Sequence, residues 1–407
     1  MRQDIGRMFP TAQAITIAFA LVIATTLAAQ AQTFSLLYTS GIGPEIPTGL
    51  TIDSAGALYG TTLYSDNEVG GGTVFQLTNH DSGWKLAVLY TFPDDTWRPS
   101  SGVILGANGG LYGTTQAGGQ GCDYGCGTIF KLLPPVHVCA TLVCSWQKTT
   151  LYSFQGGADG QLPNGLVFDH NGNLYGTTYI GGANGKGTVF ELTPSGNEWT
   201  KTILHSFDGV DGANPYSGVI LDDAGNLYGT TYGGGSQDEG VVYELTSSGS
   251  GWTEQVLHNF ANQGDGAFPA GGLVRDPSGN LYGTTLESLP GDFGGAVFEL
   301  MPSGSDWNFI QIYVLAGQYG PEASLTRDAA GNLYGTTAQD GQYDHGNVFR
   351  LSPNGSGGWI YTSLHDFDGA DGDSPDSSVI FDGNGNLYGV TVFGGLNDYG
   401  VVFEITP

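Results

Sequence analysis

The segment Gly172-Asn173-Leu174-Tyr175-Gly176-Thr177-Thr178 decides the fold, because its central tripeptide Leu-Tyr-Gly occurs seven times along the chain. The tyrosines of the seven copies are Tyr59, Tyr112, Tyr175, Tyr228, Tyr282, Tyr334 and Tyr388. Successive copies lie 53, 63, 53, 54, 52 and 54 residues apart. A fixed period of this size is the signature of a repeat architecture. The 407-residue chain is therefore built mainly from seven similar units.

The third unit predicts four short strands and no helix. The expected strands are residues 166–169, 173–178, 187–192 and 199–207. Asn171 and Gly172 separate the first two, and both residue types accept the positive φ that a tight hairpin turn requires. No stretch of the unit has the apolar period of a helix.

Two repeat architectures fit such a unit. A β-propeller blade has four antiparallel strands and packs between two neighbours, so both of its faces are apolar. An open solenoid is the alternative, but it would need atypical capping units at its ends, and none is visible. Residues 34–39 match a fourth strand, and residues 401–406 match a third strand. We therefore predict an all-β, seven-bladed propeller over residues 32–407, with four-stranded antiparallel blades and a ring closed by pairing of these two segments.

The composition agrees with this prediction and excludes other classes. Glycine occurs 69 times, and each glycine inside a helix costs about 1 kcal/mol, so a helical protein is disfavoured. The chain carries 39 acidic and 11 basic residues, a net charge of −28. Nucleic acid is not an expected partner, because proteins bind phosphates through Lys and Arg.

The N-terminal residues 1–31 predict a signal peptide. Arg2 and Arg7 precede an apolar run over residues 14–29, and Ala29-Gln30-Ala31 fits the rule for signal cleavage. A membrane anchor is the alternative, although the run has about 15 residues and a spanning helix needs about 20. Cleavage before Gln32 would leave a chain without a membrane span. We expect an exported protein, located in the periplasm or outside the cell.

These motifs resemble a known family. The pattern Gly-Asn-Leu-Tyr-Gly-Thr-Thr, Gly-Gly, Gly-x-Val-Phe-Glu-Leu and Pro-x-x-Gly is similar to the GloVer-type tandem repeat of exported "choice-of-anchor" bacterial proteins, over residues 33–407. The Asp-x-x-Gly-Asn-Leu-Tyr-Gly-Thr segment also resembles the repeats of sensor-protein propellers. The resemblance implies export and a propeller, and it supplies no reaction and no catalytic residue.

All four cysteines lie in or beside an insertion of about ten residues in the second unit, within residues 118–146. They are Cys122, Cys126, Cys139 and Cys144. The first two precede the third strand and the last two follow it, which puts the pairs about 20 Å apart, whereas a disulfide needs Cα atoms within about 7 Å. We predict the local disulfides Cys122–Cys126 and Cys139–Cys144. A zinc site is the alternative, and export to an oxidising compartment disfavours it.

Acidic loops give one candidate site. The loop to the next unit and the loop between the second and third strands are expected at the same end of the ring. We expect ligand-binding carboxylates in the first kind at Asp208, Asp211, Asp368 and Asp371. Asp371 and Asp373 are candidate calcium ligands, because oxygen atoms on glycine-rich turns suit that ion. The alternative is that Asp and Gly only build turns, and that the charge provides solubility.

Arg275 and Arg327 give a second candidate site. They occupy the same place on the first strand of adjacent units, where the other units have apolar residues. They could bind an anionic ligand near the channel. The alternative is a salt bridge with Asp276 and Asp328, which follow directly, because a buried charge needs a partner.

No catalytic motif stands out in the sequence. His205, His258 and His365 occupy one repeated position, and no phosphate loop or nucleophile elbow is present. The first functional hypothesis is a monomeric, non-enzymatic propeller that binds a glycan or a protein on its acidic loop-rich face, with calcium ordering the loops. The second is a carbohydrate-active hydrolase or lyase with carboxylates at the central pocket. Three features depart from the repeat: the insertion, the two arginines and the loop 316–321. If they lie around one pocket, a specific ligand or an enzyme is favoured.

Overall fold

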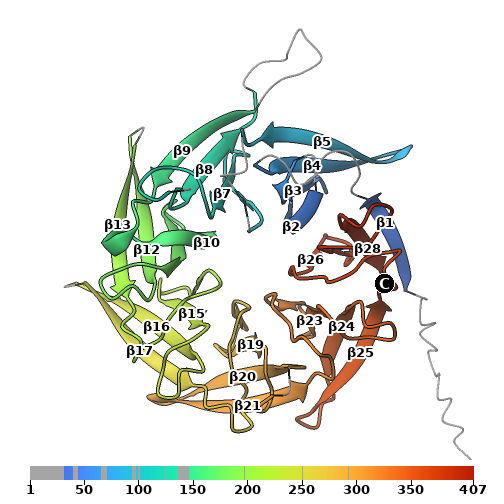
Figure 1. Ribbon diagram of the computed structural model, residues 1–407. Coiled ribbons are helices and arrows are strands. Elements are labelled where there is room, and N and C mark those ends of the chain that lie inside the picture. The colour runs from blue at the N-terminus through green and yellow to red at the C-terminus, as the bar shows by residue number, and fades with distance from the viewer. Residues whose placement is uncertain are drawn as a thin grey trace, which may run out of the picture. The chain divides into compact units, whose positions relative to one another are not determined.

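The computed structural model describes residues 32–39, 45–65, 71–93, 98–99, 101–123, 125–135, 146–196, 198–249, 251–291 and 293–407. These residues form seven four-stranded antiparallel sheets, the blades of a β-propeller (Figure 1). The one helical element in these ranges is the short 3-10 turn η1, Gly157–Asp159. The predicted fold class is confirmed. The predicted signal peptide, together with Cys139 and Cys144, lies outside the described residues.

The blades follow one another along the chain, and each runs from an inner to an outer strand. Blade 1 contains β2 (Glu45–Ile52), β3 (Leu58–Tyr64), β4 (Thr73–His80) and β5 (Gly83–Thr91). Blade 2 contains β6 (Ile104–Leu105), β7 (Leu111–Thr115), β8 (Thr128–Leu133) and β9 (Gln147–Ser153). Blade 3 contains β10 (Gln161–Phe168), β11 (Leu174–Ile180), β12 (Thr188–Ser195) and β13 (Glu198–Ser206).

The next three blades repeat this order. Blade 4 contains β14 (Ile220–Leu221), β15 (Leu227–Thr231), β16 (Val241–Ser248) and β17 (Gly251–Asn259). Blade 5 contains β18 (Val274–Arg275), β19 (Leu281–Thr285), β20 (Ala296–Ser303) and β21 (Asp306–Val314). Blade 6 contains β22 (Thr326–Arg327), β23 (Leu333–Thr337), β24 (Asn347–Pro353) and β25 (Trp359–Asp366).

Blade 7 takes its strands from both ends of the described chain. Its inner strands are β26 (Ile380–Phe381), β27 (Leu387–Val390) and β28 (Val401–Thr406), and its outer strand is β1 (Thr33–Thr39). The register pairs Thr33 with Thr406 and Thr39 with Val401. This is the predicted closure of the ring.

The core consists of seven apolar clusters, each formed by two neighbouring blades. One cluster brings Leu58 of blade 1 together with Tyr388 of blade 7. An open solenoid would lack this contact between its first and last units, so the alternative architecture is excluded.

Within a blade, the Leu-Tyr-Gly motif joins the second and third strands. In blade 3 the hydroxyl of Tyr175 donates to Glu191 Oε1 on the next strand, 2.9 Å away. A Cβ atom on Gly176 would lie 2.7 Å from Cζ of Phe190, so only glycine leaves room for that buried ring. In blade 3, therefore, the tyrosine of the motif makes a polar contact with the third strand and the glycine makes room for an apolar one.

Between blades, the first threonine of the motif forms the link. Thr177 Oγ1 donates to the main-chain carbonyl of Ser217 in blade 4, at 2.8 Å. The same bond recurs from Thr61 to Ser101, from Thr230 to Gly271 and from Thr336 to Ser377. A buried hydroxyl is thereby satisfied, and each of these four bonds links one blade to the next.

Candidate functional site

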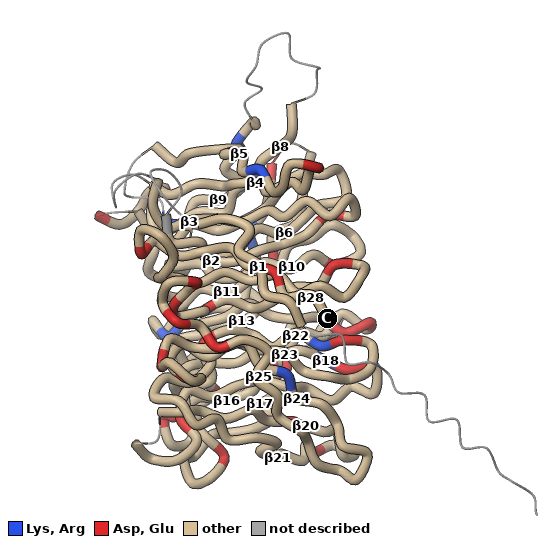
Figure 2. The backbone as a smooth tube through the Cα atoms, turned by 90° about the vertical axis from the view of Figure 1, so that its right-hand side faces the viewer, with Lys and Arg blue, Asp and Glu red and all other residues tan. Residues whose placement is uncertain are grey.

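The predicted acidic loops lie side by side at one end of the blades, as expected. Isolated bridges pair Ala213 with Gly233 and Asp373 with Phe393, each joining an interblade loop to the loop between second and third strands. The other end of the blades is acidic too, because the hairpin turns there carry an aspartate in every blade except blade 2, which has Asn108 (Figure 2). Asp169 is an example, and its Oδ1 accepts the main-chain N–H groups of Asn171 and Asn173. The negative charge is therefore not confined to one face.

Asp208 and Asp211 are engaged by their own loop. Asp208 Oδ1 accepts the N–H of Val210 and Asp211 Oδ1 accepts the N–H of Asp208. Asp211 Oδ2 lies 2.9 Å from Nε2 of His205 on the outer strand of blade 3. These contacts are what the turn-building interpretation requires, and they leave ligand binding by the two carboxylates a prediction.

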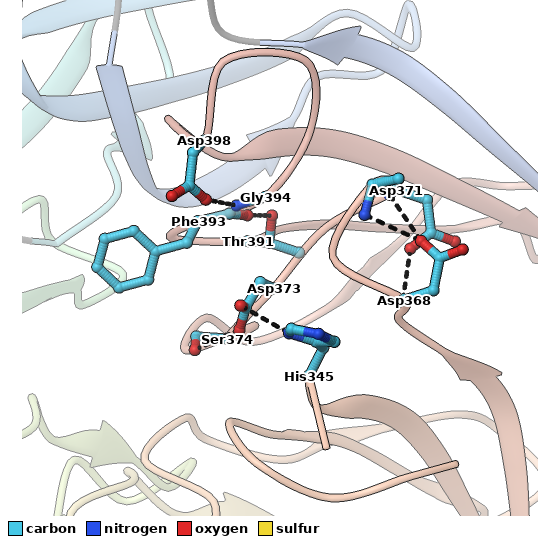
Figure 3. A network of polar contacts seen from close by, with 10 residues as sticks. His345, Asp368, Asp371, Asp373, Ser374, Thr391, Phe393, Gly394 and Asp398 are labelled. Atoms are coloured by element: carbon cyan, nitrogen blue, oxygen red, sulfur yellow. Dashed lines mark hydrogen bonds and ion pairs between the residues drawn. The ribbon is translucent and has the colours of Figure 1, made fainter. Parts of the chain in front are cut away.

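The equivalent loop before blade 7 repeats the pattern (Figure 3). Asp371 Oδ2 lies 2.8 Å from Nε2 of His365, and Asp371 Oδ1 accepts the N–H of Asp368. Asp373 Oδ2 lies 2.8 Å from Nδ1 of His345. The described residues contain no group of three or more His, Cys, Asp or Glu side chains placed to hold a metal ion. Calcium at Asp371 and Asp373 stays a prediction.

Arg275 and Arg327 end the inner strands of blades 5 and 6. They lie at the hairpin end of the blades, away from the acidic loops at the other end. No ion pair joins either of them to an acidic residue in the described part of the chain. The expected salt bridge with Asp276 and Asp328 is therefore wrong. Asp276 instead accepts hydrogen bonds from its own turn.

Cys122 and Cys126 form the predicted disulfide, with Cα atoms 5.3 Å apart. Cys126 is buried against Phe154 in the cluster between blades 2 and 3. The disulfide therefore ties the loop between β7 and β8 to the core. The two arginines lie at the opposite end of the blades from the loop 316–321. These two features therefore do not line one pocket, as a specific-ligand or enzyme site built from them would require.

A cavity of about 390 Å³ lies where the inner strands of the seven blades begin. It opens at the end of the blades that carries the interblade loops. Every blade contributes to its lining, which includes Thr48, Ser101, Asn164, Tyr216, Gly271, Glu322 and Asp376. Most of the polar lining consists of hydroxyl and amide groups, together with two carboxyls.

Symmetry breaks at the residue that follows the proline located at or shortly before the start of each inner strand. After Pro215, Pro269, Pro321 and Pro375 this residue is Tyr216, Ala270, Glu322 and Asp376, respectively. Aligning the units on these prolines would have found the site.

The two carboxyls of the cavity belong to adjacent blades, and Glu322 affects the pKa of Asp376. Burial, the Glu322 carboxylate and Asp373 together raise the pKa of Asp376 to about 7. Burial also raises the pKa of Glu322. Burial raises the pKa of Tyr216, with further contributions from Glu322 and Asp376. The tyrosine and both carboxyls are thus close enough to interact electrostatically.

A row of aromatic rings extends from the cavity across blades 3 to 5. Tyr179 and Tyr216 have centroids 5.9 Å apart, and Tyr216 and Tyr232 have centroids 6.1 Å apart. Tyr232 stacks on Phe268 at 5.1 Å. Tyr216 is 46% exposed. We call these four residues the aromatic row.

None of the described residues belongs to a helix long and apolar enough to span a membrane. No curated protein matches the chain in sequence. The Gloeobacter/Verrucomicrobia repeat matches it twice, over residues 143–294 and 275–407, which together exceed half of its length.

Solved structures share the fold at low identity. The extracellular domain of a protein described as a one-component system, from B. thetaiotaomicron, is 12% identical with a TM-score of 0.54 and covers 92% of this chain. A puromycin-hydrolyzing peptidase from Mycobacterium tuberculosis is also 12% identical, with a TM-score of 0.56 and 88% coverage. This chain spans 40% and 51% of those two proteins, respectively.

A third similar structure is an ulvan lyase of polysaccharide lyase family PL25, bound to a sugar. It is 13% identical, has a TM-score of 0.50, and the match covers 91% of this chain and 92% of the lyase. The activities of these three proteins differ, and at such identities the likeness shows the propeller fold alone.

Proposed function

We propose that this chain, which belongs to the Gloeobacter/Verrucomicrobia repeat family, is an exported β-propeller that binds a saccharide at the mouth of its central cavity. The observation that carries the proposal is the aromatic row, which runs from the surface to a cavity edged by Tyr216. Flat rings with one apolar face and one polar tip bind ligands that have both kinds of surface. A pyranose ring has an apolar face and a rim of hydroxyl groups.

The lining of the cavity supports the same ligand class. Ser101, Asn164 and Ser324 offer hydroxyl and amide groups, which can donate and accept hydrogen bonds to sugar hydroxyls. The cavity volume of about 390 Å³ lies within the range of small-molecule sites. A protein partner would instead need a broad contact surface.

Export is part of the proposal. Residues 1–31 form a cleavable signal, and the Cys122–Cys126 disulfide is compatible with an oxidising compartment. A neighbour with the same fold is an extracellular domain. The first residue of the secreted protein is then Gln32, which N-terminal sequencing of the purified secreted chain tests directly.

Binding is tested with a panel of neutral, acidic and amine-bearing oligosaccharides, followed by calorimetry. Tyr216→Ala should weaken the binding of any hit ~5-fold or more, because stacked aromatic contacts contribute on the order of 1 kcal/mol. Tyr343→Ala is a matched control, since Tyr343 is 50% exposed and lies in a loop of blade 6. Equal losses in both variants, or no binding across the panel, would contradict the proposal.

A second candidate function is hydrolysis of a glycoside. The specific observation is the pair Glu322 and Asp376, one of whose members has a pKa raised to about 7. Glycosidases pair a protonated carboxyl with an ionised one. This candidate predicts release of reducing sugar from a bound oligosaccharide, abolished in Glu322→Gln and in Asp376→Asn. Binding without product release in the parent chain would favour the first proposal.

A further inference from the structure

The cavity mouth carries negative charge that no lining residue balances. Glu322 and Asp376 are its acidic residues, and none of the described lining residues is Lys or Arg. The basic residue in the equivalent part of blade 2 is Arg98, which is exposed and does not line the cavity. Asp373 adds a further negative charge near Asp376. Glu322 and Asp376 therefore line the cavity with no Lys or Arg beside them among the described lining residues.

Two buried oxygen atoms at the same place have no partner. Asp376 Oδ1 and Ser377 Oγ are both inaccessible to solvent, and neither makes a hydrogen bond. Ser377 is only 7% exposed and lines the cavity. Buried polar atoms in folded proteins are normally hydrogen-bonded, and each unpaired one is costly. Rotation of either side chain toward the cavity would bring its oxygen within reach of a ligand that donates hydrogen bonds, and such a ligand would remove this cost.

The aromatic row supplies a second feature that favours positive charge. Tyr216 lies within electrostatic reach of both carboxyls, and Tyr232 lies within reach of Glu322. The faces of aromatic rings attract ammonium groups, and aromatic residues combined with acidic ones are a common way to bind them. Anionic sugars would meet both the carboxylates and the negative ring faces.

We propose that the ligand is an amine-bearing saccharide, whose ammonium group lies between the aromatic row and the carboxyls of Glu322 and Asp376. This inference rests on the proposed saccharide-binding function and names its ligand class. Ammonium has three N–H donors, which suit two carboxyls and a neighbouring hydroxyl such as that of Ser377. The sugar ring would stack on Tyr216, and its hydroxyls would meet the serine and asparagine side chains of the cavity.

The test compares two disaccharides that differ in charge. Glucosamine dimer is cationic, and its N-acetylated form is neutral with the same ring skeleton. Calorimetry at about pH 7.5 should show at least ~10-fold tighter binding of the cationic dimer to the parent chain. Glu322→Gln and Asp376→Asn should each remove most of this preference. Glu198→Gln is the control, because it removes one equal charge from an exposed position on the outer strand of blade 3.

The outcomes separate the two proposals. Equal binding of both dimers, or equal effects of Glu322→Gln and Glu198→Gln, would overturn the amine inference and leave saccharide binding in place if Tyr216→Ala still weakens it. Binding of neither dimer, nor of any sugar in the panel, would overturn both. Circular dichroism and thermal melts of every variant establish that a lost signal reflects the site and not unfolding.

Discussion

Phe34 stacks face to face on His365, with ring centroids 3.7 Å apart and ring planes inclined by 5°. Phe34 lies on β1, the outer strand of blade 7, and His365 lies on β25, the outer strand of blade 6. His365 is itself held by Asp371 of the intervening loop. The first strand is therefore attached to its own sheet and to the side of the preceding blade.

Phe34→Ala should weaken the closed ring. The substitution removes contacts with His365, Phe367 and Phe403 and should cost on the order of 2 kcal/mol, below the value for a fully buried phenylalanine. Urea unfolding measures the change. Leu36→Ala on the same strand is the control, because Leu36 is 43% exposed and should lose much less. Similar losses of unfolding free energy in the two variants would show that the Phe34–His365 stack does not stabilise the ring.

Tyr243→Phe should stabilise the protein. Tyr243 is fully buried, and its hydroxyl has no hydrogen-bond partner. The corresponding residue of every other blade is phenylalanine: Phe75, Phe130, Phe190, Phe298, Phe349 and Phe403. Removing the unpaired hydroxyl should raise the unfolding free energy by about 1 kcal/mol. A lower melting temperature for the variant would show that the hydroxyl has a partner after all, such as a buried water.

Asp159→Asn should destabilise the contact between blades 2 and 3. Lys201 Nζ lies 2.8 Å from Asp159 Oδ1, and the lysine side chain is only 3% exposed. Burial lowers the pKa of Lys201, while the Asp159 carboxylate opposes that effect. Losing the carboxylate leaves a buried charge uncompensated, which costs about 3 kcal/mol.

Lys201→Met supplies the matched rescue for this pair. Adding it to Asp159→Asn removes the unpaired charge and should recover most of the lost stability, as a chemical-denaturation double-mutant cycle would report. Additive losses in the cycle would mean that the two side chains do not depend on each other.

Asp376 should make stability fall as pH rises. Its pKa in the folded protein is about 7, against an ordinary value of 3.8, because of burial and the carboxyls of Glu322 and Asp373. The folded state keeps this proton where the unfolded chain has lost it, so stability is highest below about pH 4 for this group and is lost as pH rises towards 7. Between about pH 5 and pH 8, the free energy of unfolding should fall by on the order of 2–4 kcal/mol less in Asp376→Asn than in the parent chain. An unchanged pH profile would mean that Asp376 ionises normally.

The fold was predictable because one period governs the whole chain. Each Leu-Tyr-Gly motif serves both the strand pair of its own blade and the next blade, so the repeat carries local and tertiary information together. The pairing of β1 with β28 also followed from the sequence, because a spare fourth strand at one end matched a missing one at the other.

The candidate site was harder to predict, because it depends on residues that the repeat does not constrain. Tyr216, Glu322 and Asp376 lie in different blades, and only ring closure brings them to one cavity. The composition of the acidic loops predicted ligand binding there. In the structure, Asp211 accepts a hydrogen bond from the N–H of Asp208 and contacts His205. A salt bridge was expected at Arg275 because Asp276 is adjacent in sequence, but Asp276 is already bound by the N–H groups of its turn.

The shared seventh blade has a consequence for the order of assembly. Its edge strand is made before the other strands during synthesis and its partner last, with a sequence separation of 373 between Thr33 and Thr406. Blades 1 to 6 can each form as soon as their own strands emerge. Blade 7 can form only after β28, at the end of the described chain, has been made. Such long-range pairing slows folding and leaves β1 and the flank of blade 6 uncovered in the meantime. An interrupted or C-terminally clipped polypeptide would thus expose two open β edges, which is where aggregation of this protein should begin.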